Sequence, residues 1–279
     1  EFYDIFYHLS ISNDFFRAGG LFIRQLYPPF LHILEFLLLN AGIDRLILAN
    51  YLTWAFYPLS FVTLWLFMRS AFSGRAGFYA VLLLSVPAVW LEKTWGYQAN
   101  ALLLILTPLA LWAMVARRHF IAVILTFICL ITNVSGIFVV LTLIIYVLHR
   151  RRDSKLMLWL LFSIMIISVP IALVTFKRIY RYHVLWKPLS FSLSALNKII
   201  EPQQYYGYMG LIGVIGFFLC YRLKGNYLIL PAYFLANLPP LLLNYGYRFW
   251  LNILLPLAML SAILLDRIHK NISQLKKGR

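Results

Sequence analysis

The sequence predicts an all-α fold, a polytopic transmembrane helical bundle of about nine spans, from three observations. Hydrophobic residues make up 62% of the chain and charged residues only 12%, whereas soluble domains carry about 25% charged residues. The mean hydropathy is +0.81. Apolar runs of roughly 15 to 23 residues recur between short basic turns, as helices that cross a hydrocarbon core of about 30 Å require.

The first 44 residues are amphipathic rather than uniformly apolar. Over 3–17 the spacing places apolar side chains on one side of a helix and Asp4 and His8 nearer the other, which is typical of an interfacial helix. Pro28-Pro29 then begins a helix of about 13 residues that ends at Asn40-Ala41-Gly42. We expect two membrane-parallel helices on the outer surface, preceded by an N-terminal span that the sequence lacks.

The rest of the chain falls into nine apolar segments separated by basic turns, and we interpret each segment as a crossing. The short segments at 119–132 and 136–149 could be a tilted pair or half-spans. One domain over 1–279 results, with an outer loop over 1–44, a bundle over 45–268 and a basic cytoplasmic tail over 269–279. The expected crossings are 45–68, 76–91, 97–116, 119–132, 136–149, 156–176, 206–222, 227–244 and 249–268.

Lysine and arginine collect in alternate turns of this arrangement, and most acids lie in the others. The positive-inside rule assigns the basic face and the C-terminus to the cytoplasm. We therefore expect a multi-pass integral membrane protein of the plasma or inner membrane, with its active face extracytoplasmic. The basic face would hold Arg69, Arg75, Arg117, Arg118, Arg150, Arg151, Arg152, Lys155, Arg222, Lys224 and the C-terminal tail.

The net charge of +16 raises the question of nucleic acid binding. The basic residues lie in short turns, without the single stripe and interleaved exposed aromatics of a nucleic acid surface, so we expect no nucleic acid partner. Cys129 and Cys220 both fall within apolar segments, which indicates packing rather than a disulfide or a metal site.

Ionisable side chains on the expected outer face form a candidate site. Asp4 lies in the first loop and Glu92 in the next one, and either carboxylate could accept the proton of an attacking hydroxyl. Cations on the same face could offset the charge of a departing phosphate. These cations are Lys177, Arg178, Arg181 and Arg248, the last directly after Tyr247.

The order of these elements resembles the GT-C glycosyltransferases, which include oligosaccharyltransferases, protein O-mannosyltransferases and lipid A aminoarabinose transferases. The resemblance covers most of the chain. It is carried by the segments YDIFYHL (3–9), YPPFLH (27–32), MRSAFSGRAGFYAVLLLSVPAVWLEKTWGYQAN (68–100) and YRFWLNILLPLAML (247–260).

The resemblance implies a catalytic acid near the start of the first outer loop, where Asp4 stands, and a second acid in the next, where Glu92 stands. It also implies that Arg248 contacts the lipid phosphate. Metal-dependent members carry an Asp-x-Glu-like pair where this chain has Gln98 and Asn100, so a divalent metal is doubtful and no cofactor is assigned.

The predicted function is transfer of a sugar from a polyprenyl-phosphate donor to a lipid, glycan or protein acceptor, in contact with membrane lipids. Asp4 would be the base, Glu92 a supporting acid and Arg248, with Tyr247, His8, Lys177, Arg178 and Arg181, would bind the donor. Simpler interpretations stay open: Asp4 as a helix-terminal acid, Arg248 as an interface anchor. The alternative functions are a transporter or flippase of a lipid-linked substrate, and a non-catalytic assembly subunit.

Overall fold

A computed structural model describes residues 30–85, 98–150, 209–239 and 250–277, with single positions at 164 and 166. Every regular element in these ranges is a helix, so the all-α part of the prediction is correct. The elements are α3 (Phe30–Asn40), α4 (Arg45–Ala71), α5 (Gly74–Ser85), α7 (Gln98–Val115), α8 (His119–Thr132), η1 (Val134–Gly136), α9 (Ile137–Arg150), α12 (Met209–Leu223), η3 (Gly225–Leu228), α13 (Ile229–Asn237) and α14 (Trp250–Lys277).

The transmembrane part of the prediction is wrong. Within the ranges given above, no helix combines the length and the apolar composition that a membrane crossing needs. This finding overturns the bundle of about nine spans and the location as a multi-pass integral membrane protein with a cytoplasmic C-terminus. Several apolar runs form short helices: α5 has 12 residues, and α8 and α9 have 14 each. They reach only about 18 to 21 Å, and such runs are more often buried core helices.

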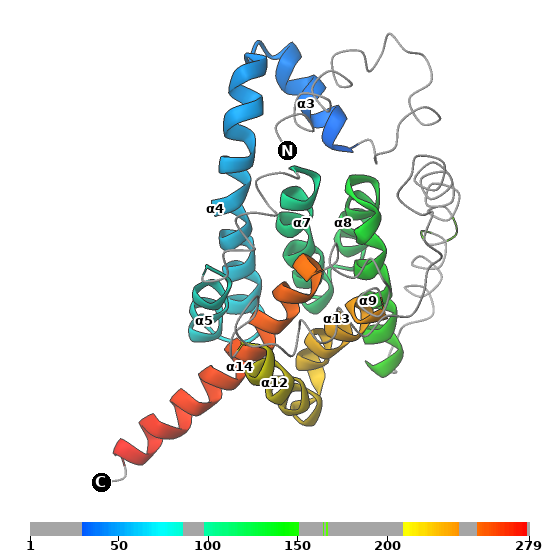
Figure 1. Ribbon diagram of the computed structural model, residues 1–279. Helices are drawn as coiled ribbons and strands as arrows, with labels where there is room; N and C mark the ends of the chain where they lie inside the picture. The colour runs from blue at the N-terminus through cyan, green and yellow to red at the C-terminus, as the bar shows by residue number, and fades with distance from the viewer. Residues whose placement is uncertain are drawn as a thin grey trace, which may run out of the picture.

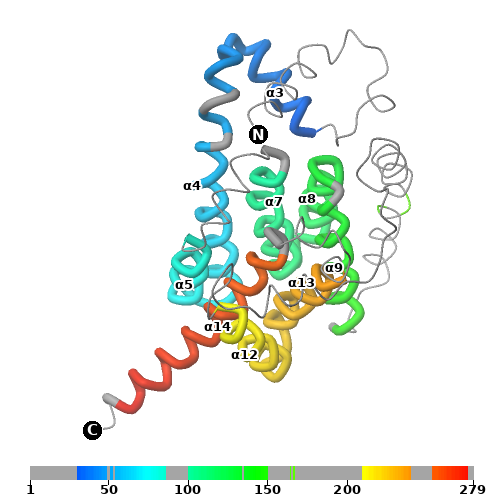
Figure 2. Tube along the Cα trace, viewed as in Figure 1, coloured from blue at the N-terminus to red at the C-terminus, as the bar shows by residue number. Residues whose placement is uncertain are grey.

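Figure 1 shows α4, α7 and α8 side by side, with α3 lying across the end of the bundle where α7 begins and α8 ends. α4 packs along α7, and α7 packs along α8. α5 packs against both α4 and α14, while α13 joins α9 to α14. The C-terminal part of α14 projects away from the bundle, as the trace in Figure 2 also shows.

The turn between α3 and α4 follows from its sequence, Asn40-Ala41-Gly42. Gly42 has a φ of +87°, a conformation that residues other than glycine rarely adopt. The amide of Ile43 donates to the carbonyl of Leu38 (3.1 Å) and that of Gly42 to the carbonyl of Leu39 (3.1 Å), the Schellman pattern. Asp44 then caps α4, accepting from the Leu46 amide at 2.7 Å. The break expected at Asn40-Ala41-Gly42 is thus confirmed.

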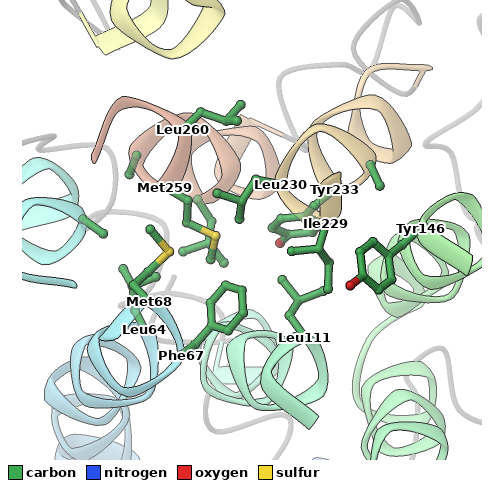
Figure 3. Close-up of a cluster of buried hydrophobic side chains, with 14 of the residues drawn as sticks. Leu64, Phe67, Met68, Leu111, Tyr146, Ile229, Leu230, Tyr233, Met259 and Leu260 are labelled. Carbon is green, nitrogen blue, oxygen red and sulfur yellow. The ribbon is translucent and has the colours of Figure 1, made fainter. Parts of the chain in front are cut away.

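The main hydrophobic core lies where α4, α7, α9, α13 and α14 meet. Figure 3 shows Phe67, Leu111 and Met259 pointing toward one another from α4, α7 and α14. A smaller core lies nearer α3 and joins Leu31 to Phe56 of α4 and to the first turns of α7. α3 is therefore held by apolar packing to the same bundle.

α12 and α14 approach each other closely because glycines line their contact. A Cβ on Gly216 would overlap the backbone carbonyl of Leu260, and one on Gly213 would lie 2.7 Å from Leu257 Cδ2. The hydroxyl of Ser261 donates to the carbonyl of Met209 at 3.1 Å across the same contact. The two helices thus pack backbone against backbone.

The basic turns at 69–75 and 222–224 lie together in the fold. The rings of Phe72 and Tyr227 are 5.0 Å apart, which joins the turn after α4 to the turn after α12. Tyr146, near the end of α9, lies 3.5 Å from Asn226 between their polar atoms. These turns occupy the end of the bundle opposite α3 (Figure 1).

Candidate functional site

A buried pair of ionisable side chains, His32 and Glu35, lies on α3. Residues three apart lie on one face of a helix, and here both side chains are fully buried. The His32 Nδ1 atom is 3.6 Å from the Glu35 Oε2 atom. Leu31 is buried beside them, while Leu37 and Asn40 on the same helix are exposed. α3 therefore directs an acid and an imidazole inward.

α3, which carries this pair, packs against α7 and α8. Leu31 belongs to the small core formed with Ala101 and Leu102 of α7 and Cys129 of α8. A buried carboxylate costs free energy unless nearby dipoles or charges compensate it, and imidazole at ion-pair distance is such a group. α3 thus holds the pair at the end of the bundle where it packs against α7 and α8.

An amide pair lies at the same end of the bundle. The Asn133 Nδ2 atom, after α8, donates to the Asn100 Oδ1 atom of α7 at 2.6 Å. The Asn133 Oδ1 atom accepts from the Ser135 amide at 2.8 Å, which fixes the side chain. Amide groups of this kind can donate to and accept from hydroxyls of a carbohydrate. The end of the bundle under α3 thus combines a carboxylate, an imidazole and two amides.

Chemically, a carboxylate oriented beside an imidazole can take a proton from a bound hydroxyl and pass it on. This is the arrangement of a general base with a polar partner. In the part of the chain that the structure describes, no group of three or more His, Cys, Asp or Glu side chains could hold a metal ion.

A second buried carboxylate, Asp266 of α14, lies at the other end of the bundle and is surrounded by donors. Its side chain is 8% exposed, and its oxygens lie 2.7 Å from Lys270 Nζ and 3.3 Å from Arg75 Nε. The Ser73 hydroxyl donates to it at 2.9 Å and accepts from the Ala76 amide at the start of α5. We interpret Asp266 as a structural link between α5 and α14.

The two cysteines are buried thiols. Burial raises the pKa of Cys129 from 9.0 to about 12, and a hydrogen bond with Thr107 only partly opposes this shift. Burial raises the pKa of Cys220 to about 12 as well. Burial also raises the pKa of Tyr233, beside Cys129. The expected role in packing agrees with this environment.

We expect neither thiol to react with a maleimide at pH 7 while the chain is folded, because the thiolate is the reactive form. Both should react after denaturation, which mass spectrometry would show. A folded pKa above the unfolded value stabilises the fold fully below pH 9.0 and less as the pH rises toward 12. Rapid labelling of the folded chain at pH 7 would contradict the burial of these cysteines.

The residues that the sequence predicts for the site lie outside the described ranges. They are Asp4, His8, Glu92, Lys177, Arg178, Arg181, Tyr247 and Arg248. Their roles stay predictions. Neither His32 nor Glu35 is among the residues predicted from the sequence. The signal that could have found them is the His-x-x-Glu spacing within an otherwise apolar helix.

Comparison with known proteins gives no relative from which a role could be transferred. No family model matches the chain, and no curated protein matches it. The resemblance to GT-C glycosyltransferases therefore rests on the sequence motifs alone.

Proposed function

We propose that the chain is a glycosyltransferase that moves a sugar from a polyprenyl-phosphate-linked donor to a hydroxyl-bearing acceptor. The observation that carries this proposal is the buried pair of Glu35 and His32 at one end of the helical bundle. Further support comes from the amides of Asn100 and Asn133 at that end and from the resemblance described above.

In the proposed reaction the Glu35 carboxylate accepts the proton of the acceptor hydroxyl. His32 lies beside Glu35 and stabilises the negative charge of the carboxylate before this transfer. The acceptor oxygen forms a bond to the anomeric carbon of the donor sugar. The bond between that carbon and the phosphate oxygen breaks, and the polyprenyl phosphate leaves with the electron pair. A cation at the leaving phosphate would lower the barrier, and Arg248 stays the sequence-based candidate for that role.

Both side chains are fully buried, so an acceptor can reach them only after a change in conformation. α3 is a short helix of 11 residues, and the turn at Gly42 joins it to α4. No atom lies within 4 Å of the position that a Cβ on Gly42 would occupy. In the proposal, α3 lifts from α7 and α8 about this turn to admit the acceptor and then excludes water again.

A transporter or flippase is supported less by the distribution of buried charge. Among the described residues, the buried Asp, Glu, Lys, Arg and His side chains are His32, Glu35 and Asp266, which lie at the two ends of the bundle. The other buried polar side chains carry hydroxyl or amide groups. Transport pathways are usually marked by ionisable side chains along their length.

The proposal is tested with Glu35→Gln in the purified chain, supplied with labelled polyprenyl-phosphate sugars and a pool of acceptors. Removal of a general base should lower the rate of sugar transfer by about 10² to 10⁴-fold. The change keeps the shape of the side chain, and the melting temperature should be measured alongside to separate catalysis from folding.

Asp44→Asn is the matched control, because Asp44 is an exposed carboxylate nearby and asparagine also caps helices well. Its transfer rate should equal that of the unchanged chain. Asp4→Asn belongs in the same series, because Asp4 is the base predicted from the sequence. If sugar transfer is lost in Asp4→Asn but not in Glu35→Gln, the proposed activity stands and Glu35 is rejected as its general base. Absence of sugar transfer by the unchanged chain would overturn the proposed function.

A further inference from the structure

The projecting end of α14, residues 267–277, has an apolar stripe that the bundle does not cover. We call this segment the α14 arm. Ile268 is 45% exposed, Ile272 50% and Leu275 73%. Their spacing of four and then three residues puts the three side chains on one side of the helix.

The rest of the α14 arm is polar and basic. Arg267 and His269 are exposed, and Lys270 is partly exposed beside Asp266. The sequence adds Lys276 and Lys277 in the last turn and contains no acid from 267 to 277. The α14 arm is therefore a basic amphipathic helix at the end of the bundle where the turns of Arg69, Arg75 and Lys224 lie.

We propose that the α14 arm binds the surface of an anionic phospholipid layer. Its apolar stripe enters the boundary between head groups and acyl chains, and its lysines and arginine lie among the phosphates. Three aliphatic side chains offer far less than the roughly 800 Å² that each partner of a standard protein interface buries. The basic charge of the rest of the α14 arm complements anionic head groups. Such binding requires no helix to cross a bilayer and is independent of the proposed activity.

The proposal is tested by measuring the environment of the α14 arm. The full chain carries Asn271→Cys, and an environment-sensitive dye is attached to that cysteine. Asn271 is exposed, and the native cysteines are buried. Vesicles of phosphatidylcholine containing phosphatidylserine should shift the dye emission to the blue, and vesicles of phosphatidylcholine alone should shift it far less. Replacing Lys276 and Lys277 by glutamine should weaken the affinity for the anionic vesicles about fivefold for each lysine.

Two further variants test the contribution of the apolar stripe and whether the basic residues must lie in the α14 arm. Ile272→Ser should remove most of the blue shift, because it interrupts the apolar stripe on an exposed surface without affecting the core. Lys224→Gln, an exposed cation outside the α14 arm, should leave the response unchanged. An equal shift with neutral and anionic vesicles would overturn the proposal. A shift that grows with protein concentration in the absence of vesicles would also overturn it, in favour of a second copy of the chain.

Discussion

Gly216→Val is expected to lower the free energy of unfolding by about 3 kcal/mol, because the new side chain would overlap the backbone of α14. The nearest atoms are the carbonyl carbon and oxygen of Leu260, which belong to a helix and cannot rotate away as a side chain could. In an exposed helix, replacing glycine normally stabilises by a few tenths of a kcal/mol or more. The close contact should outweigh this gain. Thermal or chemical denaturation followed by circular dichroism would measure the difference.

Gly74→Val is the matched control for this prediction. Gly74 is also a helical glycine, at the start of α5, but no atom lies within 4 Å of a Cβ built there. Its stability should stay within about 0.5 kcal/mol of the unchanged chain. If both variants lost the same stability, the close approach of α12 to α14 would not be the cause.

Asp266→Ala should cost about 2 to 3 kcal/mol of stability, the second largest effect that we expect. The carboxylate holds Lys270 at 2.7 Å, Arg75 at 3.3 Å and the Ser73 hydroxyl at 2.9 Å. A hydrogen bond to a charged group contributes about 1.5 to 3 kcal/mol to stability, and contributions within one network do not add. The loss is limited because Lys270 and Arg75 are 35% and 47% exposed and regain water. Denaturant titration would give the difference in unfolding free energy.

Arg75→Gln removes one half-exposed partner of the same carboxylate and should cost less than about 1 kcal/mol. We expect a smaller loss of stability for Arg75→Gln than for Asp266→Ala because the Arg75 side chain is 47% exposed, whereas that of Asp266 is 8% exposed. A loss in Arg75→Gln as large as that in Asp266→Ala would show that the exposed cation, rather than the buried acid, links α5 to α14.

The positions of several helices could be predicted from the sequence. The segments 97–116, 119–132 and 136–149 correspond to α7, α8 and α9 within two residues at each end. Arginine and glycine between the apolar runs mark these ends. What the runs face could not be predicted, because a continuous apolar helix is typical both of a membrane span and of a buried core. The segment 249–268 extends to Lys277 in α14, because lysine, glutamine and leucine favour helix beyond the last apolar turn.

The candidate site was harder to predict than the helices. His32 and Glu35 occur in a short amphipathic segment that was expected to lie on a surface, and their burial depends on tertiary packing that a local pattern does not indicate. The contact between Asn100 and Asn133 joins residues 33 positions apart, which no local pattern indicates. Asp4, Glu92 and Arg248 stay predictions from the order of motifs.

α14 is a single helix of 28 residues, about 42 Å long, that runs from the core to its exposed end. Its first half packs against the glycines of α12. Asp266 joins it to the start of α5, at the point where α14 leaves the bundle. Pro256 lies inside this helix, and no loop separates the half that α12 contacts from the exposed end. A tilt of α14 would therefore move Leu257 and Leu260 directly against Gly213 and Gly216 of α12.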